Sequence, residues 1–163
     1  MIHRHLLEMN YFDVVILLLD TGLRNCKDKR TIGHSNILNV AGLVYIERGE
    51  FQKGLAMQLK AEAIRKELLP ANHPEIANMY NNIGLTVLSL GEVEKAGELF
   101  QMAIEIDMQQ PKVDRDQILH IRHLNYADVL LLQKKYVECK RHIELGRVYA
   151  ILTFGTDTHL VAQ

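Results

Sequence analysis

Residues 76–108 read IANMYNNIGLTVLSLGEVEKAGELFQMAIEIDM, and this stretch decides the fold class. Its first half repeats apolar or small side chains every three or four residues, the period of one helix face, at Tyr80, Ile83, Gly84 and Val87. Gly91 ends that helix, and a second helix is predicted from Glu92 to Met108 before Pro111. The inner face of the second helix holds Ala96, Leu99, Phe100, Ala103 and Ile106. We therefore expect two antiparallel helices that approach closely where Gly84 and Ala96 are small.

The same pattern recurs along the chain at a spacing of 42 residues. The matched positions are Gly42 and Gly84, Gly49 and Gly91, Gly54 and Ala96, Ala61 and Ala103, and Ile64 and Ile106. A third copy appears when Ala127 takes the place of Gly84, with a connection that is one residue longer. A helix pair cannot bury its apolar face alone, so repeated pairs are expected to stack on one another.

These repeats predict a single all-α domain over residues 1–163. We expect a truncated repeat at 1–33, full repeats at 34–74, 75–116 and 117–159, and the start of a following unit at 160–163. In the truncated repeat, a short helix at about Ile2–Glu8 would lead through a turn at Asn10–Phe12 into a helix over Asp13–Lys27. The charged stretch Lys112–Asp116 is expected to be a solvated connector.

The small-residue lattice of Gly84, Ala96, Phe100 and Ala103 resembles the tetratricopeptide motif. The longer period and the linker within AIRKELLPANHPEIA (residues 63–77) resemble the 42-residue kinesin-light-chain type of repeat, whose linker typically reads LGxDHPxxA. Pro70 and Ala71 depart from that linker, and FGTDTHLVA (154–162) lacks its proline. The resemblance covers residues 34–162 and implies a tetratricopeptide-like solenoid, a right-handed superhelix of antiparallel helix pairs. It implies structural, locally hydrogen-bonded roles for the linker histidines His73 and His159.

Composition argues against several classes of function. The formal net charge of -1, from 19 basic and 20 acidic side chains, gives no strong field for nucleic acid or anionic membranes. The apolar run Val14–Leu19 is too short to span a membrane. Cys26 and Cys139 are not spaced as metal ligands or as a redox motif, so we expect reduced thiols and a cytoplasmic protein.

No pattern typical of a catalytic or nucleotide-binding site is present: the sequence lacks GxGxxG, GxxxxGK[ST], HExxH and GxSxG motifs. His120 and His123 would need further metal ligands, which only Glu138, Cys139 or His142 from the paired helix could supply. Partly exposed histidines at a repeat surface are the simpler interpretation. We therefore expect no enzyme activity, no metal and no cofactor.

The resemblance places each first helix of a pair on a concave wall, where a partner would bind. The side chains predicted to bind a peptide there are Asn39, Leu43, Asn78, Asn81, Asn82, Leu85, Asn125 and Asp128. An amide offers both donors and an acceptor, so a ladder of asparagines can hydrogen-bond the main chain of an extended peptide, and leucines can receive its apolar side chains. Asn36 and Asn78 could instead be helix caps. Because Asn39, Asn81, Leu124 and Asp128 occupy sites where related proteins carry basic residues for acidic tails, such tails are disfavoured.

The first long helix carries an apolar run all the way round, which is unusual for a helix that faces water. Val14, Val15 and Leu18 are therefore candidates for self-association into a homo-oligomer, unless the short preceding helix covers them. Two alternatives to a peptide-binding scaffold thus remain open: a self-associating structural module, and a sensor or regulatory repeat region of a larger signalling protein.

Overall fold

The computed structural model describes residues 11–155, except for the side chains of Val113 and Asp114. In this part of the chain, seven α-helices and no strands are found, which confirms the predicted all-α class. The chain divides into two compact units, Met1–Leu69 and Pro70–Gln163. The predicted helix at 2–8 and the start of a further unit at 160–163 lie outside the described residues.

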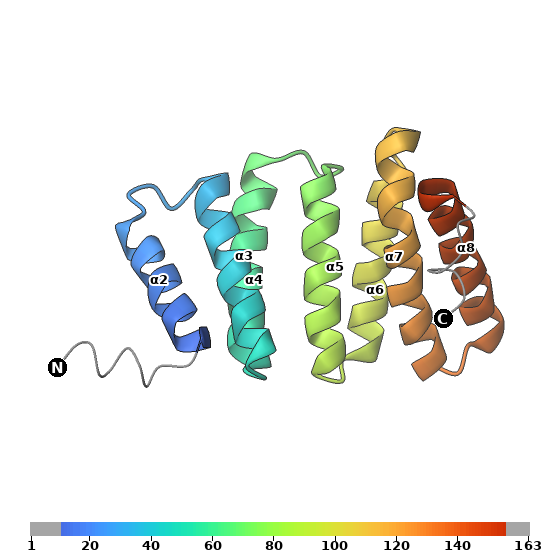
Figure 1. Ribbon diagram of the computed structural model, residues 1–163, viewed down its shortest axis with the longest axis horizontal. Helices are drawn as coiled ribbons and strands as arrows, with labels where there is room; N and C mark the ends of the chain where they lie inside the picture. The colour runs from blue at the N-terminus through green and yellow to red at the C-terminus, as the bar shows by residue number, and fades with distance from the viewer. Residues whose placement is uncertain (1–10, 156–163) are drawn as a thin grey trace. The chain divides into compact units, whose positions relative to one another are not determined.

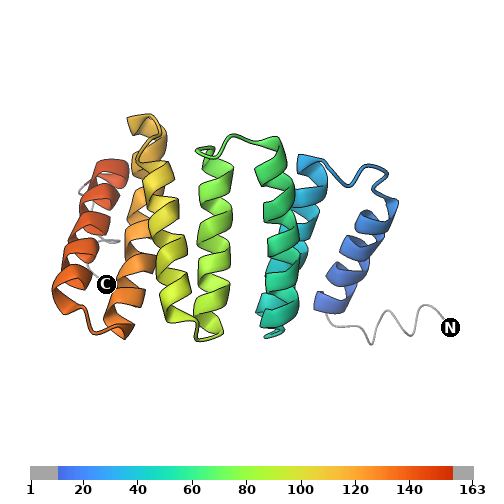
Figure 2. The same cartoon turned by 180° about the vertical axis from the view of Figure 1, so that it is seen from behind.

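The first unit contains α2 (Tyr11–Asn25), α3 (Ile32–Glu47) and α4 (Phe51–Leu68). Helices α3 and α4 form an antiparallel pair (Figures 1 and 2). A Cβ on Gly42 would lie 3.0 Å from the backbone oxygen of Gly54, so this close approach requires glycine. The close approach of the paired helices thus explains the small residues at these two positions, as predicted.

Helix α2 begins earlier and ends earlier than predicted. Tyr11 and Phe12, expected in a turn, are helical, and the helix ends at Asn25 rather than Lys27. Tyr11 and Phe12 pack edge to face within the first turn, with ring centroids 5.9 Å apart, which suits two aromatic side chains on one helix.

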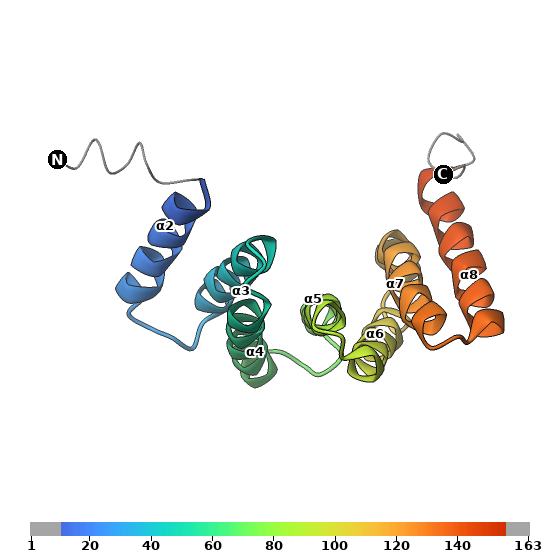
Figure 3. The same ribbon diagram turned by 90° about the horizontal axis from the view of Figure 1, so that it is seen from below.

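The second unit contains α5 (Pro74–Ser89), α6 (Val93–Asp107), α7 (Lys112–Leu132) and α8 (Tyr136–Phe154). Helix α6 packs against both α5 and α7, and α7 packs against α8, as the view from below shows (Figure 3). Fully buried side chains fill this unit, among them Ile76, Met79, Ile83, Phe100, Leu119 and Leu130. A Cβ on Gly84 would lie 2.7 Å from the ring of Phe100, as the predicted lattice requires.

The stretch Lys112–Asp116 is not the connector that we predicted. It forms the first turn of α7, which begins directly after Pro111 and runs for 21 residues. The charges in this stretch suggested a solvated loop, but a proline with a fixed φ also favours the start of a helix. The repeat boundaries proposed above stay predictions.

The helix starts are capped by residues other than the two asparagines considered above. The Thr31 hydroxyl accepts a hydrogen bond from the His34 backbone N–H at the start of α3, at 3.1 Å. His73 Nδ1 accepts one from the Glu75 backbone N–H at the start of α5, also at 3.1 Å. Asn36 and Asn78 lie inside the helices, so interpreting them as caps was wrong.

Candidate functional site: the wall of α5 and α7

Six of the predicted peptide-binding residues lie in the second unit, on the two first helices of its pairs. We call this surface the α5–α7 wall; it comprises these six residues, Asn78, Asn81, Asn82 and Leu85 on α5 and Asn125 and Asp128 on α7, together with the neighbouring Leu124 on α7. Each position follows from the helical period, because residues three or four apart share one face of a helix. The structure divides these side chains into a buried, hydrogen-bonded group and an exposed group.

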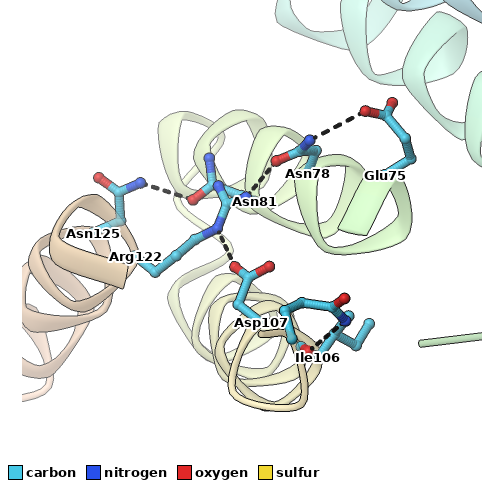
Figure 4. A network of polar contacts seen from close by, with 8 residues as sticks. Glu75, Asn78, Asn81, Ile106, Asp107, Arg122 and Asn125 are labelled. Atoms are coloured by element: carbon cyan, nitrogen blue, oxygen red, sulfur yellow. Dashed lines mark hydrogen bonds and ion pairs between the residues drawn. The ribbon is translucent and has the colours of Figure 1, made fainter. Parts of the chain in front are cut away.

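The buried group begins with a direct amide contact between the two helices. Asn125 Nδ2 donates a hydrogen bond to Asn81 Oδ1 at 2.8 Å (Figure 4). The Asn81 side chain is buried, and Asn125 is half-buried. Part of the predicted asparagine ladder therefore holds α5 and α7 together, and its Asn81 acceptor is already in use in this structure.

A buried ion pair continues this network toward α6. Arg122 Nε on α7 donates to Asp107 Oδ2 on α6 at 2.9 Å, and both residues are buried. Another Arg122 nitrogen donates to Asn78 Oδ1, and Asn78 Nδ2 is 3.4 Å from Glu75 Oε1 (Figure 4). Burial raises the pKa of Asp107, and the hydrogen bond and positive charge of Arg122 oppose that shift. Arg122 therefore compensates a carboxylate that would be costly to bury alone.

Arg122 and Asp107 were not predicted from the sequence to be structural partners. The sequence did contain one indication of a buried ion pair: each charged residue lies on the apolar face of its helix, since Asp107 follows the buried Ile106 and Arg122 lies three residues after the buried Leu119.

The first unit uses a different arginine at the equivalent place. There Arg65, at the position equivalent to Asp107, donates to Asn36, the equivalent of Asn78. In both units an arginine thus occupies the amide oxygen of this asparagine.

The exposed group of the wall is the part that a partner could reach. Leu85 on α5 and Leu124 on α7 have 42% and 43% of their surface exposed. Asn82 is half-buried and Asp128 is exposed. This surface combines apolar side chains with a nearby amide and a carboxylate, which suits an extended segment with alternating apolar and polar side chains.

The other two predicted wall residues lie on α3 of the first unit. Leu43 is exposed, and Asn39 is half-buried with a buried Oδ1 that has no hydrogen-bond partner in the described residues. A buried carbonyl oxygen without a donor costs free energy, and a ligand N–H or a water molecule could provide the missing hydrogen bond.

The residues predicted for self-association lie on α2. Val14 and Val15 are half-buried, while Leu18 has 67% of its surface exposed. No residue of α2 is buried. Asp13 anchors the start of the helix through an ion pair with Arg48, at 2.7 Å.

The histidines do not assemble a metal site among residues 11–155. No group of three or more metal-ligating side chains converges there. His120 packs edge to face on Phe154, whereas His123 contacts His142 across the α7–α8 interface, with the two Nδ1 atoms 3.0 Å apart. Cys139 does not join them and lies in an apolar cluster with Ala127 and Leu130.

Comparison with known proteins agrees with this architecture. Residues 34–109 match the tetratricopeptide repeat family model. These residues are thus similar in sequence to tetratricopeptide repeats. The matched stretch covers the α3–α4 and α5–α6 pairs. A comparison with curated proteins gave no match.

Solved structures show the same tetratricopeptide fold at low sequence identity. The nearly identical TPR-like repeats of a protein from Podosopora anserina assigned as a kinesin light chain are 15% identical, with a TM-score of 0.68 over 88% of this chain and 69% of that one. BtubC (BKLC) from P. vanneervenii is 15% identical, with a TM-score of 0.74 over 88% of this chain. PilF from Pseudomonas aeruginosa is 19% identical, with a TM-score of 0.57 over 82% of this chain. This chain spans 57% of BtubC and 58% of PilF. The predicted resemblance to light-chain-type repeats is thus confirmed at the level of the fold.

Among the described residues, no helix combines the length and the apolar character needed to cross a membrane.

Proposed function

We propose that this tetratricopeptide-repeat protein is a non-catalytic scaffold that binds an extended, partly apolar peptide along the α5–α7 wall. Tetratricopeptide repeats serve in general as surfaces for protein–protein interaction, because stacked helix pairs leave one face of each first helix free of internal packing. The observation that carries the proposal is the exposed group of the wall: Leu85 and Leu124 leave 42% and 43% of their surface exposed and lie on helices held by the buried network.

The buried network contributes rigidity to this surface. The contacts Asn81–Asn125 and Arg122–Asp107 hold α5, α6 and α7 in one arrangement (Figure 4). A preorganised wall spends less conformational entropy on binding. We therefore assign Asn82, Leu85, Leu124 and Asp128 to peptide contact, and Asn78, Asn81 and Asn125 mainly to the position of the helices.

The proposal can be tested at these two leucines. Leu85 is the cleaner site, because Leu124 also packs on α8, where its Cγ lies 3.2 Å from the position that a Cβ on Gly146 would take. We expect Leu85→Glu and Leu124→Glu each to weaken binding at least tenfold to peptides selected from a random display library on the parent protein. A buried hot-spot side chain typically contributes more than 1 kcal/mol to binding, and a charge would have to be desolvated at the same place.

Met102→Glu is the matched control. Met102 lies on α6 and has 41% of its surface exposed, nearly the same as the two leucines. All three variants should keep the parent circular-dichroism spectrum. Equal loss of binding in Met102→Glu, or unchanged binding in both leucine variants, would rule out the α5–α7 wall as the peptide site.

A second function, self-association through α2, has its own observation. Leu18 is exposed to 67% on a helix with no buried residue. If this surface joins two copies, light scattering should show a mass that increases with concentration, and Leu18→Glu should keep the protein monomeric. A constant monomer mass in the parent would exclude this function.

A further inference from the structure

Helices α7 and α8 meet through two histidines, His123 and His142. At the equivalent positions, the other two helix pairs carry no side chain that titrates in the neutral pH range. With the repeat offsets of 42 and 43 residues, His123 corresponds to Leu38 and Tyr80, and His142 corresponds to Met57 and Leu99. In each pair the first-helix residue is buried and the second-helix residue is half-buried. Two imidazoles therefore stand where the other two pairs of this chain carry Leu38 with Met57 and Tyr80 with Leu99.

Whether the two imidazoles can form a hydrogen bond depends on how many protons they carry. The Nδ1 atoms of His123 and His142 are 3.0 Å apart, a hydrogen-bond distance, and the His123 side chain is only 5% exposed. When both rings are neutral, one Nδ1–H can donate to the other Nδ1. When both rings are protonated, two N–H groups and two positive charges face each other, and neither nitrogen can accept.

Aromatic rings enclose the pair from both helices. His123 stacks on Tyr149 of α8, with ring centroids 5.6 Å apart, and His142 meets Tyr126 of α7 edge to face, at 4.8 Å. Tyr149 in turn reaches Met108, whose sulfur lies 3.6 Å from the phenol oxygen. Rearrangement of the imidazoles would therefore disturb packing between α7 and α8 beyond the two rings themselves.

The charged groups around the pair provide little compensation for added protons. His142 shares a cavity of about 380 Å³ with Glu105 of α6 and with Glu138 and Arg141 of α8. Glu138 raises the pKa of His142, but burial and Arg141 lower it, and the lowering prevails. His120 on α7, a further titratable group at this interface, also has a pKa lowered by burial, and burial raises the pKa of Tyr126.

We propose that the His123–His142 contact is an acid-sensitive latch, which holds α8 on α7 at neutral pH and loosens this helix pair as the solution becomes mildly acidic. Burial, and to a lesser extent His142, lowers the pKa of His123 from 6.5 to about 4. Because the folded state binds protons more weakly than the unfolded state, the stabilising effect is complete above about pH 6.5. It is lost as the pH falls toward 4. This inference does not depend on peptide binding at the α5–α7 wall.

The decisive experiment replaces the two imidazoles with the apolar residues found at the equivalent positions of the first full repeat. The double variant His123→Leu with His142→Met carries the residues of positions 38 and 57 and leaves His34 and His120 unchanged as internal controls. Between pH 7 and pH 5, we expect the Tm of the parent to fall by about 4–8 °C more than that of the double variant. EDTA in all samples excludes a contribution from bound metal. Equal pH dependence of the two proteins would overturn the proposal.

A direct measurement on the parent keeps the proposal testable if the double variant does not fold. Titration of the histidine ring signals by nuclear magnetic resonance should give pKa values for both His123 and His142 below the ordinary histidine value of 6.5. Hydrogen exchange at pH 5 should increase in α8 more than in α5. A pKa of 6.5 or higher for both rings in the folded protein, or uniform exchange across both helices, would contradict it.

Discussion

At the residue scale, single charged side chains decide how the helices of this protein are joined. Arg122 satisfies Asp107 and Asn78 at once, so one guanidinium links α7 to both α6 and α5. A planar group with five donors can serve several acceptors in fixed directions, which a lysine cannot. The equivalent asparagine in the first unit, Asn36, receives its arginine from α4 instead.

This pairing predicts a large and non-additive effect of mutation. Arg122→Met should lower the free energy of unfolding by about 3–5 kcal/mol, because it leaves Asp107 buried without a positive partner. The double variant Arg122→Met with Asp107→Leu should recover most of that loss, since an apolar pair can replace a buried ion pair. Urea unfolding of the three proteins gives the coupling energy. A loss below about 1 kcal/mol in Arg122→Met would show that solvent already screens the carboxylate.

At the element scale, the sequence predicted helices well where the signal was local. The spacing of Tyr80, Ile83, Gly84 and Val87 placed α5 correctly, because helical periodicity is carried by neighbouring residues. The start of α7 was missed because charge suggested a loop. The predicted role of Asn81 was also incomplete. The pattern of helix faces shows on which face the amide lies, but only the position of α7 shows that Asn125 donates a hydrogen bond to it. Contacts between helices far apart in sequence were therefore the part that could not be predicted.

The turns between paired helices give an element-scale prediction. Gly49 and Gly91 have positive φ angles of 79° and 83°, whereas the equivalent Lys134 has φ 60°, the one positive-φ residue other than glycine in the described chain. A side chain in this left-handed region costs roughly 1 kcal/mol or more, and glycine avoids that cost. Lys134→Gly should therefore raise the free energy of unfolding by about 0.5–1 kcal/mol in urea titrations, whereas Gly91→Ala should lower it. A destabilised Lys134→Gly protein would mean that the lysine side chain makes a compensating contact.

At the scale of the whole molecule, stability in a repeat protein is expected to vary along the chain. Each helix is held mainly by its immediate neighbours, so stability approximates a sum of local terms. Helix α5 contributes nine buried residues, while α2 contributes none and is held to α3 by few contacts and the Asp13–Arg48 ion pair. An exposed ion pair of this kind adds at most about 1 kcal/mol. The apolar character of α2 alone could not tell us whether the fold would bury it.

This difference predicts where the protein opens first. In hydrogen exchange at neutral pH and low protein concentration, the amides of α2 should exchange at least about a hundredfold faster than those of α5, because α2 can detach without breaking the core. The same measurement separates the two proposed interaction surfaces. If α2 joins two copies, its protection should increase with protein concentration, and Leu18→Glu should abolish that increase. If α2 stays unprotected at every concentration while a selected peptide slows exchange in α5 and α7, the α5–α7 wall is the binding surface and α2 is only a frayed end. Protection of α2 equal to that of α5 in the monomer would contradict the local-stability argument, because nothing buried in α2 could account for it.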